Sequence, residues 1–264
     1  MILKRVLNGV LLIISIIIVG LVVHKIYLYI YVLQDASEYP SGAKDNMVIY
    51  SINSETILAS IDHENANIFM PALKNPIYDE DVELLWTPGS LAWGSEDYLK
   101  VADVLHQATW NEHLKNWKLY SASYDLFQCA DVTRIDNAAF GFYQRKGNWY
   151  FLVHNMTIDL GYGLVYAGDD NGYYTGKWKD IDLDKAIIDK ADKALLIAEQ
   201  NGGKETRLSL VGSHDCSINI FLAPFVLNKK NWGWKVTYSS GEESVYEMII
   251  EPYTGKFDIL NSGQ

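Results

Sequence analysis

Two histidines and two tryptophans recur at helical spacing near the middle of the chain. His106, Trp110, His113 and Trp117 occupy positions i, i+4, i+7 and i+11, so one continuous helix would place all four on the same face. Such a face could bind a metal ion or another ligand, or it could pack its aromatic rings on a sheet with the histidines at the rim. Histidines seven residues apart cannot bind one ion together unless the helix breaks, and spacing ties no carboxylate to them. We therefore expect packing here, and no metal site.

Two short polar segments resemble parts of calcium-binding or catalytic motifs. Asp169–Gly172 (DDNG) begins like a calcium loop, but Tyr173 and Tyr174 interrupt the alternation of acidic residues that such a loop needs. This segment therefore predicts a β-turn. Ser213–Cys216 (SHDC) contains four reactive side chains, yet neighbours in a strand point to opposite faces and cannot form one triad. Motifs of hydrolases, metalloproteases and nucleotide-binding proteins are missing from the sequence, so we expect no catalytic residue and no cofactor.

The chain has two cysteines, Cys129 and Cys216. Outside the cytoplasm such a pair usually forms a disulfide, and the alternative is two independent buried thiols. Their separation does not fit a zinc site, which needs closely spaced pairs of ligands. A disulfide that closes a loop of about 90 residues would remove roughly 3–5 kcal/mol of chain entropy from the unfolded state.

The start of the chain combines positive charge with a long apolar run. Lys4 and Arg5 precede 18 uncharged residues, Val6 to Val23, and after a short interruption the apolar run continues to residue 33. A helix of this length spans a bilayer core of about 30 Å. We predict a transmembrane helix that contacts the lipid bilayer through residues 6–33.

The charges beside the apolar run predict its orientation. Lys and Arg stay on the cytoplasmic side of a membrane, so we expect the N-terminus inside and residues 34–264 outside, in the periplasm or the extracellular space. This is the topology of a single-pass signal-anchor in the cytoplasmic (inner) membrane. The alternative is a cleaved signal peptide, which would need a shorter apolar core and small residues at the cleavage site. The sequence leaves open whether the anchor is ever cleaved.

Acidic residues outnumber basic ones. The chain has 22 basic and 33 acidic residues, a net charge of −11. Leaving out Lys4, Arg5 and Lys25, the three basic residues of the apolar segment, gives a net charge of −14 for residues 34–264. Nucleic acid repels such a domain, so we expect no nucleic-acid partner. A basic protein or a cation is favoured instead, although solubility alone also explains the charge.

Helical and strand-like segments alternate in a pattern that predicts four regions. They are the cytoplasmic N-terminus and anchor (1–33), a tether and irregular segment (34–94), and two α+β modules (95–180 and 181–264). Helices are expected at residues 95–117 and 183–200, and strands at residues 118–128, 138–144, 149–158, 163–167, 207–211, 217–222, 234–238, 245–250 and 257–260. Ser95 precedes Cys129 by 34 residues, as Asp182 precedes Cys216, which an internal duplication would produce. The predicted fold class is α+β: an N-terminal transmembrane helix followed by two helix-plus-antiparallel-sheet modules.

The second module carries two structural motifs near its end. A strand with the pattern W-x-V begins at Trp234. A later strand ends in an acidic residue and a turn that contains Thr-Gly-Lys, at Glu251–Lys256 (EPYTGK). With the helix before them, residues 183–260 resemble a PepSY-type domain. The resemblance implies a small α+β module outside the cytoplasm, often tethered to a membrane. The family occurs in propeptides of thermolysin-like proteases and is linked to protease inhibition, and it shares no catalytic residues.

Aromatic side chains in or near the expected turns form a candidate interaction surface. They are Tyr162, Tyr166, Tyr173, Tyr174, Trp178 and Trp232. Tyr and Trp carry much of the binding energy at protein interfaces, although here they could instead cover the edges of a sheet. We expect a non-enzymatic module that binds another protein, as an inhibitor or immunity protein or as a subunit of a cell-envelope complex. The alternative is a small-ligand sensor or carrier with a pocket between helix and sheet, and an enzyme ranks third.

Overall fold

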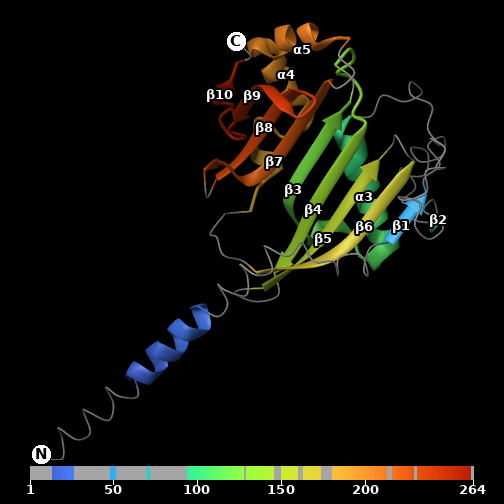
Figure 1. Ribbon diagram of the computed structural model, residues 1–264. Coiled ribbons are helices and arrows are strands. Elements are labelled where there is room, and N and C mark those ends of the chain that lie inside the picture. Colours follow the sequence, from blue (N-terminus) through green and yellow to red (C-terminus); the bar gives the residue numbers. More distant parts are fainter. Residues whose placement is uncertain are drawn as a thin grey trace, which may run out of the picture. The chain divides into compact units, whose positions relative to one another are not determined.

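The computed structural model divides the chain into two units, Met1–Asp45 and Asn46–Gln264 (Figure 1). It describes residues 14–26, 48–51, 70–71, 94–127, 129–145, 150–159, 163–173, 180–212, 216–228 and 231–262. In the first unit, residues 14–26 form a helix whose side chains are exposed. The second unit contains the sheet and the remaining helices.

The predicted transmembrane helix is not found among the described residues. Within the predicted span, the structure describes residues 14–26, which are helical. In the part of the chain that the structure describes, no helix is long and apolar enough to cross a membrane. This finding contradicts the predicted transmembrane signal-anchor and the single-pass location in the cytoplasmic membrane. The rest of the predicted span, residues 6–13 and 27–33, lies outside the described residues.

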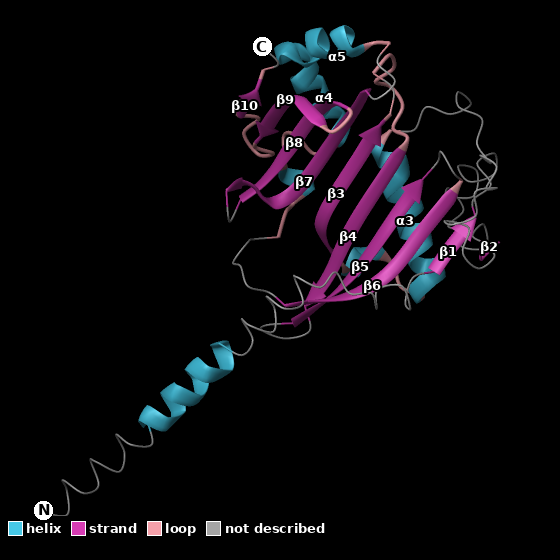
Figure 2. Ribbon diagram, in the orientation of Figure 1, coloured by secondary structure: helices cyan, strands magenta, loops and turns pink. Residues whose placement is uncertain are grey.

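The second unit is built on one antiparallel sheet of ten described strands (Figure 2). Their order across the sheet is β10-β9-β8-β7-β3-β4-β5-β6-β1-β2. The strands are β1 (Val48–Ser51), β2 (Met70–Pro71), β3 (Lys118–Leu126), β4 (Asn137–Arg145), β5 (Tyr150–Asp159), β6 (Leu164–Tyr173), β7 (Cys216–Asn228), β8 (Asn231–Ser240), β9 (Glu243–Ile250) and β10 (Phe257–Asn261).

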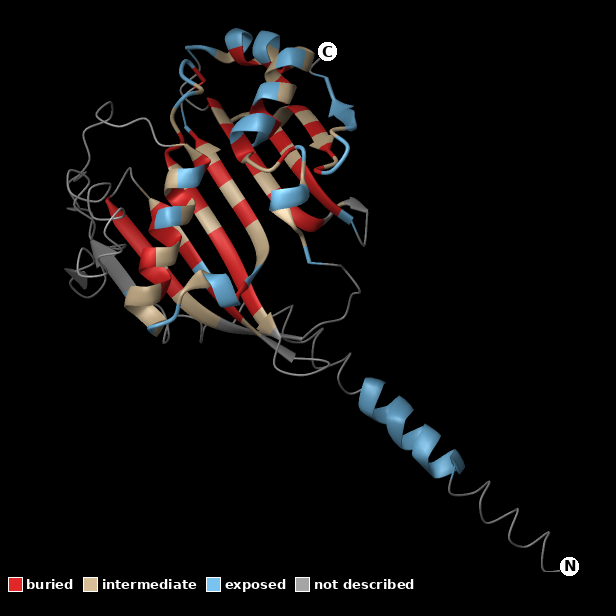
Figure 3. Cartoon of the chain, turned by 180° about the vertical axis from the view of Figure 1, so that it is seen from behind, coloured by how far each residue is buried: buried red, intermediate tan, exposed pale blue. Residues whose placement is uncertain are grey.

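Helices cover one face of this sheet, which Figure 3 views from the helical side. They are α3 (Ser95–Trp110), α4 (Ala191–Ala198) and α5 (Lys204–Leu210), with the short turns η3 (Leu114–Asn116), η4 (Leu183–Lys185) and η5 (Glu199–Gly203). Burial along β3 shows which face is covered: Ala122, Tyr124 and Leu126 are buried, and the residues between them are half-buried. Alternate residues of a strand point to opposite faces, so one side forms the main core, whereas on the other side Tyr143 and Val153 form a small buried cluster with Tyr120.

The predicted division into two helix-plus-sheet modules is wrong, because the two groups of strands form one sheet. β3 and β7 pair along five residues, from Ala122 opposite Leu222 to Leu126 opposite Ile218. Buried side chains from both groups belong to one hydrophobic cluster. Strand-forming patterns identified most of the strands, but they contain no information on which strands from distant parts of the chain will pair.

Three predicted local elements also differ from the structure. Asp169–Gly172, expected to form a turn, lies within β6 and pairs with β5. The strand expected at residues 207–211 overlaps helix α5 instead. The helix expected at residues 183–200 is shorter, because residues 183–185 form the separate turn η4 and α4 runs only from Ala191 to Ala198. After α4, Gly202 adopts a left-handed conformation at φ 106° and the chain resumes as α5.

Candidate functional site

Two buried histidines meet between α3 and the sheet. His106 lies in the last turns of α3, and His154 lies on the inner face of β5; both are at most 3% exposed. The helix ends at Trp110, because Asn111 adopts a left-handed conformation with φ 56° and its N–H bonds to the carbonyl of Gln107. The chain therefore turns back toward the sheet before it enters β3.

Hydrogen bonds define how the two imidazoles share protons. Nδ1 of His106 lies 2.6 Å from the carbonyl oxygen of Glu112, and its Nε2 lies 2.8 Å from Nδ1 of His154. Because a carbonyl only accepts, His106 carries its proton on Nδ1, and its Nε2 accepts the proton of His154 Nδ1. Burial lowers the pKa of His106 and favours this neutral arrangement.

Two tryptophans enclose the histidine pair. The rings of Trp110 and Trp117 both stack on His154 with centroid distances of 3.9 Å and interplanar angles of 11° and 27°. Two rings this close to one imidazole must lie on its opposite faces. Nε1 of Trp117 also donates to the Glu112 carboxylate at 3.0 Å. We call His106, His154, Trp110 and Trp117 the histidine cluster.

Helical spacing predicted one shared face for His106, Trp110, His113 and Trp117, but the helix ends before the last two. His106 and Trp110 pack toward the sheet as expected, whereas His113 and Trp117 reach the region through the turn at Asn111. The partner histidine, His154, was missed, because it lies 48 residues away on another element. Its position among apolar residues of a strand was the only local signal for it.

A recess of about 500 Å³ opens beside this cluster. It is lined by Leu99, Asp103, His113, Leu114, Lys115 and Phe142. Oδ1 of Asp103 accepts the N–H of Leu114 at 2.7 Å, and Oδ2 lies 3.2 Å from Nδ1 of His113. The spacing of residues in the sequence predicted no carboxylate beside His113. The contact with Asp103 forms because the chain reverses its direction at Asn111. Phe142 is the direct cross-strand neighbour of His154, so the recess and the histidine cluster share a wall.

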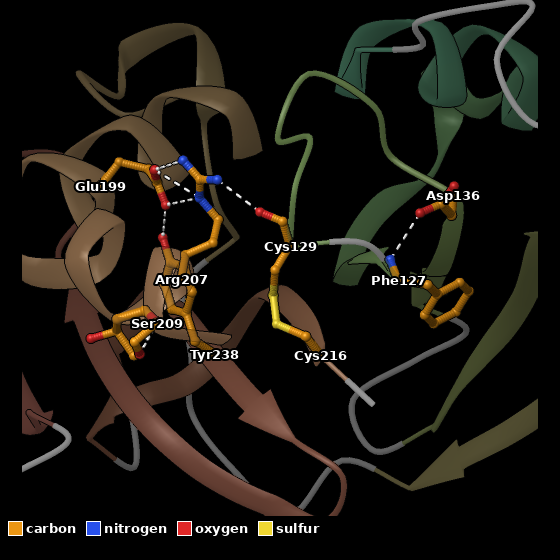
Figure 4. The surroundings of a disulfide bond; sticks show 9 residues. Phe127, Cys129, Asp136, Glu199, Arg207, Ser209, Cys216 and Tyr238 are labelled. Carbon is orange, nitrogen blue, oxygen red and sulfur yellow. Dashed lines mark hydrogen bonds and ion pairs between the residues drawn. A yellow bond between two sulfur atoms is a disulfide. The ribbon is translucent and has the colours of Figure 1, made fainter. Parts of the chain in front are cut away.

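The predicted disulfide between Cys129 and Cys216 is present (Figure 4). It joins the segment after β3 to the start of β7, with 5.8 Å between the Cα atoms. Beside it, Arg207 of α5 binds the Glu199 carboxylate and donates to the carbonyl oxygen of Cys129 at 2.7 Å. The side chains of Arg207 and Glu199 are only 9% and 12% exposed.

Tyr238 completes this buried network by donating its hydroxyl to Glu199 at 2.7 Å. Burial and this hydrogen bond raise the pKa of Tyr238, and the contact with Glu199 raises the pKa of Arg207. All the groups are paired with each other, so the network stabilises the packing of α5 on β8 and the disulfide segment. We call Glu199, Arg207 and Tyr238 the arginine network.

The predicted aromatic interaction surface stays a prediction for most of its residues, because only two of its six side chains are described. Trp232 is only 5% exposed and belongs to the core, which corrects its placement on the surface, and Tyr166 is half-buried on β6. Tyr162, Tyr174 and Trp178, together with the side chain of Tyr173, lie outside the described residues. Among the described residues, no group of three or more His, Cys, Asp or Glu side chains could hold a metal ion.

A different apolar surface lies at the edge strand β10. Phe257, Ile259 and Leu260 are 41%, 44% and 56% exposed. Phe257 and Ile259 pair directly with Ile250 and Met248, which are fully buried. Directly opposed residues of antiparallel strands share a face, so the apolar inner face continues onto β10 but is left uncovered there. The sequence of β10 (FDILN) predicted a strand, but position at an edge cannot be read from it.

Comparison with protein-family models, with curated protein sequences and with solved structures finds no match to this chain. The resemblance of residues 183–260 to PepSY-type domains therefore stays a prediction.

Proposed function

We propose that this protein is a non-enzymatic module that binds another protein through the edge strand β10. The observation that carries this proposal is the exposure of Phe257, Ile259 and Leu260 on a terminal strand of the sheet. On its outer side β10 pairs with no other described strand. An edge of this kind presents unpaired backbone groups and binds an extended segment of a partner as an additional strand.

The inner face of β10 supplies side-chain contacts beside the backbone edge. Phe257 and Ile259 stand two residues apart and point to the same side. A partner strand that bonds to β10 would place alternate apolar side chains against them, and the buried apolar area would add to the backbone hydrogen bonds.

The negative charge of the chain favours a basic partner segment. The chain has a net charge of −11, and Asp258 is the second residue of β10. This charge opposes the pairing of two copies of the chain edge to edge and attracts a basic segment. The proposed partner segment is therefore extended, with apolar residues alternating with Lys or Arg.

A set of synthetic peptides tests this function. Fluorescent eight-residue peptides of alternating Lys and Val, alternating Glu and Val, and Lys-Val with a central proline are titrated against the full chain. We expect the Lys-Val peptide alone to bind, because the acidic peptide is repelled and proline cannot pair along its whole length. Hydrogen exchange should slow at β10 when this peptide is bound.

Two charge-neutral substitutions separate strand addition from simple charge attraction. Ile259→Asn removes apolar surface at the edge, and Leu196→Asn removes an apolar side chain of α4 that is even more exposed. We expect the first to weaken peptide binding about tenfold and the second to leave it unchanged. Equal effects of both variants, or binding without protection of β10, would refute the proposal.

A further inference from the structure

We infer that the recess beside α3 binds a small zwitterion with an apolar side group, the chemistry of a free apolar amino acid. This site is separate from β10 and does not depend on the function proposed for that strand. The recess is lined by residues of α3, η3 and β4. Its volume of about 500 Å³ lies within the range of small-molecule sites, roughly 300–1,000 Å³.

One side of the recess is apolar. Leu99 of α3, Leu114 of η3 and Phe142 of β4 contribute to its lining. Phe142 is only 6% exposed and lies across from His154, which two tryptophans hold in place. This wall is therefore firmly packed, and an aliphatic or aromatic side group could bury surface against it without reorganising the sheet.

The second feature is an anchored carboxylate. Asp103 accepts one hydrogen bond from the Leu114 N–H and one from His113, so its position is fixed by two elements. Its side chain is still 36% exposed. A carboxylate can accept about four hydrogen bonds, so two donors leave it able to accept from a ligand. A primary ammonium group is the partner that supplies both the charge and the donors.

The third feature is a cation on the same lining. Lys115 borders the recess and is exposed. A ligand that carried only a positive charge would be attracted by Asp103 and repelled by Lys115. A ligand that also carries a carboxylate interacts favourably with both, which selects a zwitterion over a simple amine.

A series of three related ligands tests each part of this inference on the unmodified full chain. L-phenylalanine has all three groups, phenethylamine lacks the carboxylate, and 3-phenylpropanoate lacks the ammonium. In a nuclear magnetic resonance titration we expect L-phenylalanine to shift the amides of Leu99 and Leu114. Phenethylamine should bind a few-fold more weakly and 3-phenylpropanoate at least about tenfold more weakly.

Substitutions assign the two charges. Asp103→Asn keeps an acceptor for the Leu114 N–H but loses the charge, and should weaken L-phenylalanine binding by about tenfold or more. Asp184→Asn, a matched change at an exposed acid of η4, should have no effect. Lys115→Ala should reduce the affinity for L-phenylalanine to that for phenethylamine.

Three outcomes would overturn the inference. They are no shift near the recess at about 10 mM ligand, equal binding of 3-phenylpropanoate and L-phenylalanine, or undiminished L-phenylalanine binding by Asp103→Asn. The first two need no variant, so they stand even if a substitution perturbs folding.

Discussion

The inner face of the sheet is covered differently at its two ends. Toward the end that continues from β6 to β1 and β2, α3 packs on β5 and β6, and Val165 and Ala167 of β6 are completely buried. Near the other end, α4 packs on β7 and β8 and α5 on β8, while Phe257 and Ile259 of β10 are more than 40% exposed. β6 is further bordered by β1, whereas β10 is the last described strand. The difference locates the surface that is open to a partner.

The polar groups under the helices differ in the same way. Under α3 they are two buried imidazoles, His106 and His154, enclosed by indole rings. Under α5 they are a charged pair, Glu199 and Arg207, joined to Tyr238 and to the disulfide segment. The two groups respond differently to substitution, because an uncompensated buried charge costs more than an unsatisfied neutral group.

The largest effect is expected from breaking the arginine network. Arg207→Met leaves the Glu199 carboxylate nearly buried without its counter-charge and removes the donor to the Cys129 carbonyl. We expect the free energy of unfolding to fall by about 3–5 kcal/mol, measured by urea denaturation under non-reducing conditions.

The matched control for Arg207→Met is Lys235→Met, which breaks the more exposed pair of Lys235 with Glu247. That change should cost less than about 1 kcal/mol. Equal losses in the two variants would mean that the arginine network adds no more to stability than a surface ion pair.

The exposure of β10 can be tested by truncating an isoleucine at a buried position and another at an exposed position. Ile158 on β5 is completely buried, whereas Ile259 on β10 is 44% exposed. Ile158→Ala should lower the free energy of unfolding by about 2–5 kcal/mol, because it leaves a cavity under α3. Ile259→Ala should lower it by less than about 1 kcal/mol. A large loss at Ile259 would show that β10 is covered in solution, and would remove the basis for partner binding at this edge.

Local signals in the sequence predicted much of this fold. The helix was expected to begin at Ser95, where α3 begins, although its predicted end at residue 117 passes the left-handed Asn111. The strands expected at residues 149–158 and 245–250 match β5 and β9 to within two residues. The disulfide followed from the presence of only two cysteines.

Long-range contacts could not be predicted in this way. The pairing of β3 with β7 joins residues about 95 positions apart in the sequence, and the pairing of His106 with His154 joins two elements. Trp232 followed a predicted turn and was placed on the surface, but the fold of β8 turns it into the core. The open edge at β10 depends on strand order, which hydrophobic alternation does not encode.

The smallest expected effect concerns pH and the histidine cluster. Burial lowers the pKa of His106 below its ordinary value of about 6.5, against the opposing influence of the Glu112 carbonyl, Glu112 and Asp103. The unfolded chain therefore binds a proton more readily than the folded chain as the pH falls below about 6.5. Stability is complete above that pH and is lost as the pH falls, by at most about 1.4 kcal/mol per pH unit for one proton.

The measurement is the free energy of unfolding between pH 7.5 and pH 5.5. Carboxyl groups with a lowered pKa, such as those of Asp131 and Asp189, titrate below this range. His106→Gln should flatten the dependence. A slope that persists in His106→Gln would assign the proton to another group. A slope that disappears in that variant would show that mild acid weakens the fold at the covered end, where His106 is buried, and not at the charged network under α5.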